Sequence, residues 1–293
     1  MSRSGLWQLP LYLFFASVAN IIFLVRAVKD YRRKKQDAPA AISLLFLAIA
    51  ELIWAVPCFI QCFMTFISNK GDHWWVATES NTGCDIMGFY SVFASVSGQM
   101  LVTQLAAYSY SSVVLNSPWS VGTIAKVSAF AYLSSLIYCI LPFTGVGSYA
   151  PSGEGFCYID WSNSALVLLM QMVTVPCMMA TIFFYGSLTF SGTSIKETNE
   201  KAICRLWIAA SLSYVSAWVL WIPAAFIGLG SDEPYPTMFP AGYMISGGIL
   251  GHAQAILNPI IYGVYWRSLF ISDDDIESED NTESFVAHSD EFA

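Results

Sequence analysis

The chain has 293 residues, of which 56% are hydrophobic and only 12% are charged, and its mean hydropathy is +0.55. Soluble domains carry about 25% charged residues, so this composition excludes a soluble globular protein. The formal net charge of −8 arises in the segment from Ser272 onward, which holds nine of the 21 acidic residues and no Lys or Arg. The rest of the chain is nearly neutral, and we expect no nucleic-acid partner.

Seven apolar stretches of about 20 residues follow one another along the chain, which is the length that crosses a membrane as a helix. An isolated span satisfies its backbone hydrogen bonds only as a helix, so each stretch predicts one transmembrane helix. The stretches are 7–27, 41–67, 84–113, 123–144, 163–189, 203–229 and 238–262. The sequence therefore predicts an all-α membrane protein with a seven-transmembrane helix bundle over 7–262.

The distribution of Lys and Arg predicts the orientation of this bundle. Eleven of the thirteen fall on one side of the predicted membrane, and only Arg3 and Lys70 fall on the other. Residues 1–6 are then a short extracellular N-terminus, and the C-terminus is cytoplasmic. After the seventh span, residues 263–271 are amphipathic, and we expect them to form a short helix along the membrane surface.

Residues 272–293 are the acidic segment, which we expect to be a disordered cytoplasmic tail. Five hydroxyl residues stand among its acids: Ser272, Ser278, Thr282, Ser284 and Ser289. Two interpretations stay open for them, namely a plain solvated tail or a phosphorylated one that a kinase or arrestin recognises.

Two of the seven cysteines lie on the predicted extracellular side, Cys84 at the start of the third span and Cys157 in the loop before the fifth. Disulfides persist in that oxidising compartment, so we expect these two to pair. The other five lie in or at the ends of apolar stretches and are predicted to be buried thiols.

The last span holds polar residues that a lipid-facing helix would not carry. In GILGHAQAILNPIIYGVYW (248–266), His252, Gln254 and Asn258 interrupt an apolar run. Each unsatisfied polar group in hydrocarbon costs several kcal/mol, so these side chains are expected to face the interior of the bundle. For His252 two roles stay open, a hydrogen bond to a neighbouring helix or a contact with a ligand.

Several motifs together resemble the rhodopsin-like (class A) G-protein-coupled receptors, and among them the opsins most closely. They are ANIIFLV with Asn20, LAIAEL (47–52), TGCDIMGFY (82–90), the loop 141–161 with Cys157, Trp221-Ile222-Pro223, and Asn258-Pro259-Ile260-Ile261-Tyr262. The resemblance covers residues 7 to about 270. It implies a multi-pass receptor of the plasma membrane that responds to a small molecule and acts on a heterotrimeric G protein.

The sequence departs from the family at three functional positions. The acid-Arg-Tyr motif falls on Tyr108, Ser109 and Tyr110, so that Ser109 replaces the arginine that engages the G protein. The lysine that links retinal in opsins falls on His252, and imidazole cannot form a Schiff base with an aldehyde. The counterion position falls on Met87, which has no charge. We therefore expect no covalent retinal and no other cofactor, although a retinoid held without a covalent bond stays open.

The resemblance also implies two interior sites. A ligand pocket is predicted from Met87, Ser91, Trp221 and His252. A polar switch network is predicted from Asn20, Glu51, Gln254, Asn258, Pro259 and Tyr262. Glu51 stands where the family has Asp, and a sodium ion at this residue is the metal site that the resemblance implies. A purely structural hydrogen-bond network is the alternative. Trp221 and Pro223 together predict a hinge in the sixth span.

The leading hypothesis is an opsin-like receptor that binds a small, largely apolar ligand and transmits the binding by helix rearrangement. One alternative is a seven-helix protein that binds a retinoid or lipid without signalling, and another is a chemoreceptor nearer the cyclic-AMP receptor group. An enzyme is not expected, because no nucleophile, base and orienting group can be assembled from one intramembrane His and one Glu.

Overall fold

The computed structural model describes residues 8–33, 38–67, 82–151, 157–160, 164–191, 194–228 and 241–271. The predicted extracellular segment 1–6 and the predicted tail 272–293 lie outside these residues. The helices are α1 (Gln8–Arg33), α2 (Ala38–Ile67), α3 (Thr82–Val113), α4 (Val121–Ile140), η2 (Leu141–Thr144), α5 (Ser164–Phe190), α6 (Ser194–Trp218), α7 (Trp221–Gly228), α9 (Ala241–Gly251), α10 (Ala253–Ile260), the π-helical η3 (Ile261–Trp266) and α11 (Arg267–Phe270).

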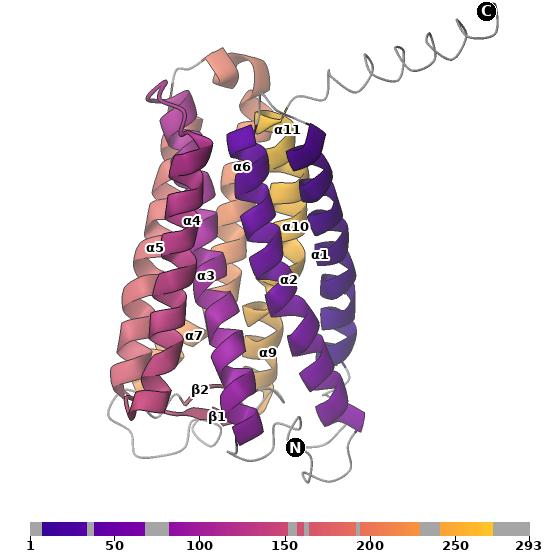
Figure 1. The fold of residues 1–293 in the computed structure, drawn as a ribbon, viewed down its shortest axis with the longest axis vertical. Helices are drawn as coiled ribbons and strands as arrows, with labels where there is room; N and C mark the ends of the chain where they lie inside the picture. The colour runs from indigo at the N-terminus through magenta and orange to yellow at the C-terminus, as the bar shows by residue number, and fades with distance from the viewer. Residues whose placement is uncertain are drawn as a thin grey trace, which may run out of the picture.

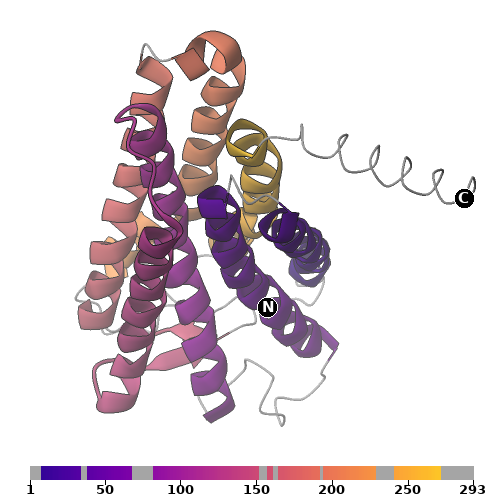
Figure 2. The same cartoon turned by 45° about the horizontal axis from the view of Figure 1, so that its top comes forward.

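The long helices run side by side as a bundle, with α3 packed against α2, α4 and α5 (Figure 1). Six of the described helices are long and apolar enough to cross a membrane. The seventh span is divided into α9, α10 and η3, and it packs against α1, α2 and α6. In Figure 2 this yellow segment lies between α6 and α1. The predicted seven-helix bundle is confirmed, with a seventh helix that is interrupted.

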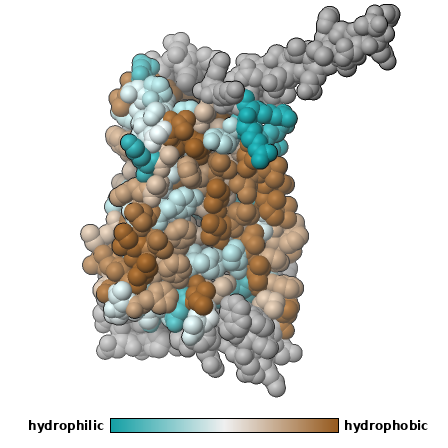
Figure 3. All heavy atoms as spheres, viewed as in Figure 1, coloured by the Kyte–Doolittle hydropathy of each residue, from teal (hydrophilic) through white to brown (hydrophobic). Residues whose placement is uncertain are grey.

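Apolar side chains cover the outside of the bundle, as the brown belt in Figure 3 shows. On α1, Phe15 and Val25 are 57% and 63% exposed, and on α5 Met172 is 65% exposed. Contiguous apolar surface of this extent needs an apolar solvent. The lipid bilayer supplies it, which agrees with a protein that crosses the membrane several times.

A hairpin of two short strands covers one end of the bundle, and α11 lies at the opposite end (Figure 1). Strand β1 (Tyr149–Pro151) pairs antiparallel with β2 (Cys157–Ile159). A disulfide joins Cys84, in the first turn of α3, to Cys157, which confirms the predicted pairing. The backbone N–H of Cys157 also donates to Oε1 of Gln61 on α2 at 3.2 Å. These two bonds fix the hairpin over α2 and α3.

The sixth span is broken where the Trp-x-Pro motif predicts a hinge. Helix α6 ends at Trp218 and α7 begins at Trp221, two residues before Pro223. Proline is tolerated in the first turn of a helix, because the N–H that it lacks has no intrahelical partner there. The helix break therefore lies just before Trp221, and Pro223 lies in the first turn of the next helix.

Pro259 leaves a free carbonyl in the seventh span, and a side chain of α1 satisfies it. Proline has no N–H to donate to the carbonyl four residues earlier, which is that of Ala255. The amide Nδ2 of Asn20 donates to this Ala255 oxygen at 2.7 Å. Asn20 thus joins α1 to α10 by a hydrogen bond to the carbonyl that Pro259 leaves without its helical donor.

The predicted surface helix 263–271 is shorter in the structure. Residues 263–266 continue the seventh span as part of η3, and only Arg267–Phe270 form α11. The reason is Trp266, whose side chain is fully buried in the bundle. Arg267 holds the start of α11 against α1 through two contacts to Asp30, Nε to Oδ2 at 2.8 Å and Nη2 to Oδ1 at 2.9 Å.

Candidate functional site

The interior of the bundle contains a cavity of about 740 Å³, including the part that is open to solvent. The cavity is lined by Glu51, Trp54, Ala94, Ser95, Gly98, Gln99, Val102, Tyr158, Tyr214, Ala217, Trp218, Trp221, Gly251, His252, Gln254, Ala255 and Asn258. It is mostly apolar and aromatic, with a few polar groups that converge on it.

Strand β2 closes the cavity on the hairpin side. The Tyr158 hydroxyl donates to Ser95 Oγ at 3.3 Å and lies 3.8 Å from the Met170 sulfur. Two residues predicted to contact the ligand lie beyond this closure. Ser91 is one helical turn nearer the hairpin than Ser95, and Met87 packs against the disulfide. Neither is among the residues that line this cavity.

Trp221 lines the cavity as predicted, and its indole is packed flat on α9. Its Nε1 donates to the Gly247 carbonyl at 2.9 Å. A Cβ at Gly247 would lie 3.2 Å from the indole ring, and a Cβ at Gly251 would lie 2.6 Å from Nε1. The Gly-x-x-x-Gly spacing therefore lets the sixth and seventh spans approach closely. Sequence reasoning missed this pair, although the spacing itself is a known signal in membrane helices.

His252 lines the cavity at the break between α9 and α10. Its backbone has φ −90° and ψ 0°, in the sparsely populated bridge region where many active-site residues lie. The side chain is 2% exposed, and its ring centroid lies 5.4 Å from that of Trp54. The cavity wall thus contains a buried imidazole at the position that the resemblance predicts for the retinal-linking lysine.

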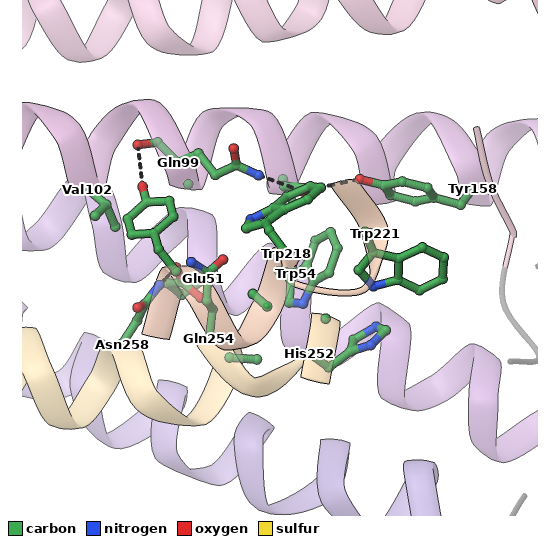
Figure 4. A pocket seen from close by; sticks show the side chains of 17 residues that line it. Glu51, Trp54, Gln99, Val102, Tyr158, Trp218, Trp221, His252, Gln254 and Asn258 are labelled. Carbon is green, nitrogen blue, oxygen red and sulfur yellow. Dashed lines mark hydrogen bonds between the residues drawn. The ribbon is translucent and has the colours of Figure 1, made fainter. Parts of the chain in front are cut away.

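The predicted polar network is divided in the structure. Oε1 of Glu51 accepts from Nδ2 of Asn258 at 2.6 Å, and both residues line the cavity with Gln254. Asn20 lies behind them and binds the α10 backbone at Ala255. Figure 4 shows Glu51, Asn258 and Gln254 at one end of the cavity, and Trp221, His252 and Tyr158 toward the other.

Pro259 and Tyr262 are buried but lie outside the cavity, Pro259 in α10 and Tyr262 in η3. No group of three His, Cys, Asp or Glu side chains that could hold a metal ion occurs among the described residues. A sodium ion at Glu51 would therefore depend on neutral amide and hydroxyl oxygens, which are ligands that hard cations accept. The sodium site stays a prediction.

At the α11 end of the bundle, Ser109, the serine predicted at the position of the family arginine, is bonded to a tryptophan. Trp266 Nε1 donates to Ser109 Oγ at 2.7 Å, and that hydroxyl donates to the Leu105 carbonyl at 2.7 Å. The Trp266 ring is stacked on Phe270 with centroids 4.7 Å apart, and Tyr108 lies 6.1 Å from it. The third helix and the end of the seventh span are thus joined at this position.

Tyr110, the third residue predicted for coupling, points to a different neighbour. Its ring lies 5.4 Å from that of Phe184 on α5. Sequence reasoning identified Tyr108, Ser109 and Tyr110 by their place in the family motif but missed Trp266, which is buried at the end of the π-helical η3.

Residues 19–262 match the family model of the 7 transmembrane receptor (rhodopsin family). Melanopsin-B of Xenopus laevis is 21% identical over 287 residues, covering 86% of this chain and 51% of that protein. Rhodopsin of Alligator mississippiensis is 25% identical over 260 residues, covering 79% and 69%. The chain thus spans about half the length of the first relative and about two thirds of the second. The crystal structure of squid rhodopsin has a TM-score of 0.66 at 16% identity, over 98% of this chain and 87% of that one.

Proposed function

Because the chain belongs to the rhodopsin family of seven-transmembrane receptors, we propose that it is an opsin-like G-protein-coupled receptor that binds a small, largely apolar ligand without a covalent bond. Its membership supports a membrane receptor rather than an enzyme, since the matching proteins are opsins and receptors. The observation that carries the proposal is His252, which is buried at the cavity wall where a primary amine would be needed to bind retinal covalently.

The contacts of Trp221 indicate how an occupied cavity changes the bundle. Its indole lies in the cavity wall and is hydrogen-bonded to α9, while the helix break just before it separates α7 from α6. A ligand that displaces this indole alters the packing between the sixth and seventh spans at a hinge. Movement of one helix about such a hinge is an ordinary switching transition in proteins.

The G protein is proposed to bind at the α11 end of the bundle, which the positive-inside rule places in the cytoplasm. Ser109 and Trp266 lie there, joined by the 2.7 Å hydrogen bond. This bond occupies the position from which the family arginine acts, so its opening is part of the proposed active conformation. Recognition of the tail by a kinase or arrestin belongs to the same proposal, as does residence in the plasma membrane.

The experiment that tests the ligand site uses purified receptor incubated with 11-cis- or all-trans-retinal and then washed in detergent. We expect the wild type to retain no chromophore that sodium borohydride fixes to the protein, because no primary amine lines the cavity among the residues that the structure describes. His252→Lys restores that amine and serves as the matched variant. A borohydride-fixed band in the wild type contradicts the proposal. All-trans-retinol, which forms no Schiff base, tests non-covalent binding in the same preparations through the shift in thermal unfolding.

A further inference from the structure

We infer that the ligand is an organic cation, a protonated amine on an alkyl or arylalkyl body, whose charge lies against Glu51. The inference rests on the proposed function and narrows its ligand class. It does not follow from the resemblance to opsins, whose retinal is an aldehyde. It follows from the charge and the aromatic content of the cavity wall.

The cavity wall carries one carboxyl group and no Lys or Arg among the described residues that line it. Glu51 is 6% exposed, and the neighbour that donates to it is the Asn258 amide at 2.6 Å. A carboxylate accepts several hydrogen bonds, and an ionised one is costly inside a membrane without a positive partner. A protonated amine supplies both the missing charge and further N–H donors. A neutral apolar ligand would supply neither.

The position of Glu51 allows such a contact. Gly98 on the facing helix α3 has no side chain, and a Cβ there would lie 3.5 Å from Oε1 of Glu51. The absence of a side chain at Gly98 therefore leaves room for the carboxyl group of Glu51 where both residues line the cavity. Gln99 and Gln254 line the cavity as well, so further polar groups are available to the same ligand.

Five large aromatic side chains complete the wall: Trp54, Trp218, Trp221, Tyr158 and Tyr214. In Figure 4, Trp54 and Trp218 lie between the Glu51 end and the Trp221 end of the cavity. The faces of such rings attract cations within about 6 Å of the ring centroid, and tryptophan does so most strongly. The same rings bury an apolar body. A carboxyl group at one end of an aromatic enclosure is the arrangement that binds an amine with a hydrophobic substituent.

Other ligand charges fit less well. An anion such as a cyclic nucleotide needs basic partners, and the titratable groups of the described wall are Glu51, His252 and two tyrosines. An uncharged retinoid uses the aromatic rings but leaves Glu51 with one amide donor. If the protein is the chemoreceptor that the sequence left open as an alternative, its ligand would therefore be a cation and not an anionic cyclic nucleotide.

The test measures thermal unfolding of the purified receptor, followed by the reaction of its buried thiols with a fluorogenic reagent. Cys58, Cys62 and Cys139 are free and buried, so they report unfolding. The probes are 4-phenylbutylamine and its uncharged analogue 4-phenylbutan-1-ol. At concentrations far above its dissociation constant, the amine is expected to raise the Tm by roughly 5 °C. The alcohol is expected to bind about tenfold to a hundredfold more weakly, because it lacks the charged hydrogen bond.

Glu51→Gln keeps an oxygen that accepts from Asn258 but removes the charge, and it should abolish the preference for the amine. Asp85→Asn is the matched control, since it removes one carboxylate that does not line the cavity. Equal shifts from amine and alcohol in the wild type overturn the inference, as does a preference that survives in Glu51→Gln. If neither probe raises the Tm, the cationic class is also overturned. The separate measurement with all-trans-retinol then shows whether the cavity binds an apolar ligand, and so whether the proposed function is contradicted as well as the cationic ligand.

Discussion

Trp266 is expected to hold the receptor in its resting conformation through its hydrogen bond to Ser109. Trp266→Phe keeps an aromatic ring to stack on Phe270, where the present centroids are 4.7 Å apart, and removes the N–H that donates to Ser109 Oγ at 2.7 Å. A hydrogen bond of this kind contributes about 1 kcal/mol. If the active conformation lacks the bond, the change shifts the resting-to-active equilibrium about fivefold. Basal nucleotide exchange should rise by the same factor.

The assay is the rate at which purified receptor in lipid nanodiscs stimulates guanine-nucleotide exchange without added ligand. Trp119→Phe is the matched control, because Trp119 also packs on Tyr108, at 6.4 Å, but has no bond to Ser109 among the described contacts. The control should leave the basal rate unchanged. The reasoning is refuted if Trp266→Phe leaves the rate at the wild-type value, or if both substitutions change it equally.

Two further predictions concern the contacts of the seventh span with α7 and with α1, and both are measured as the change in the free energy of thermal unfolding. Gly251→Ala places a Cβ 2.6 Å from Nε1 of Trp221 and should destabilise the fold by about 1–3 kcal/mol. Gly186→Ala is the control, because its Cβ would lie 3.4 Å from the nearest atom, Nε1 of Trp207, and it should destabilise the fold much less. Similar losses for the two would contradict the close approach of α7 and α9. Asn20→Ala removes the donor to the Ala255 carbonyl and should cost about 1–3 kcal/mol. Ser17→Ala, whose hydroxyl bonds to its own helix, should cost less, and an equal cost would argue against the bond between helices.

The spans and the disulfide were predictable because they depend on properties that the local sequence carries. Membrane thickness sets the length of an apolar run, so the predicted 84–113 differs from α3 (Thr82–Val113) by two residues at one end. Cys84 and Cys157 were identified by the compartment that their loops face, and they pair in the structure. These features need no knowledge of how the helices pack.

The interior of the site was only partly predictable, because it depends on contacts between distant segments. Trp221 and His252 line the cavity, whereas Met87 and Ser91 do not, and which of the four contact a ligand stays a prediction. No sequence pattern shows that the Tyr158 hydroxyl bonds to Ser95 and closes the cavity at that residue, one helical turn farther from the hairpin than Ser91. The same limit applies to the seventh span, whose interruption at His252 and π-helical continuation appear only in the folded bundle.

Signalling through a heterotrimeric G protein is measured as stimulated nucleotide exchange. Receptor in lipid nanodiscs would be mixed with each of the main classes of heterotrimeric G protein, with empty nanodiscs as the baseline, and Trp266→Phe would be measured beside the wild type. We expect exchange above the baseline for at least one class, with a higher rate for the variant. Rates equal to empty nanodiscs for every class, in both proteins, would contradict signalling and favour a seven-helix protein that binds its ligand without signalling.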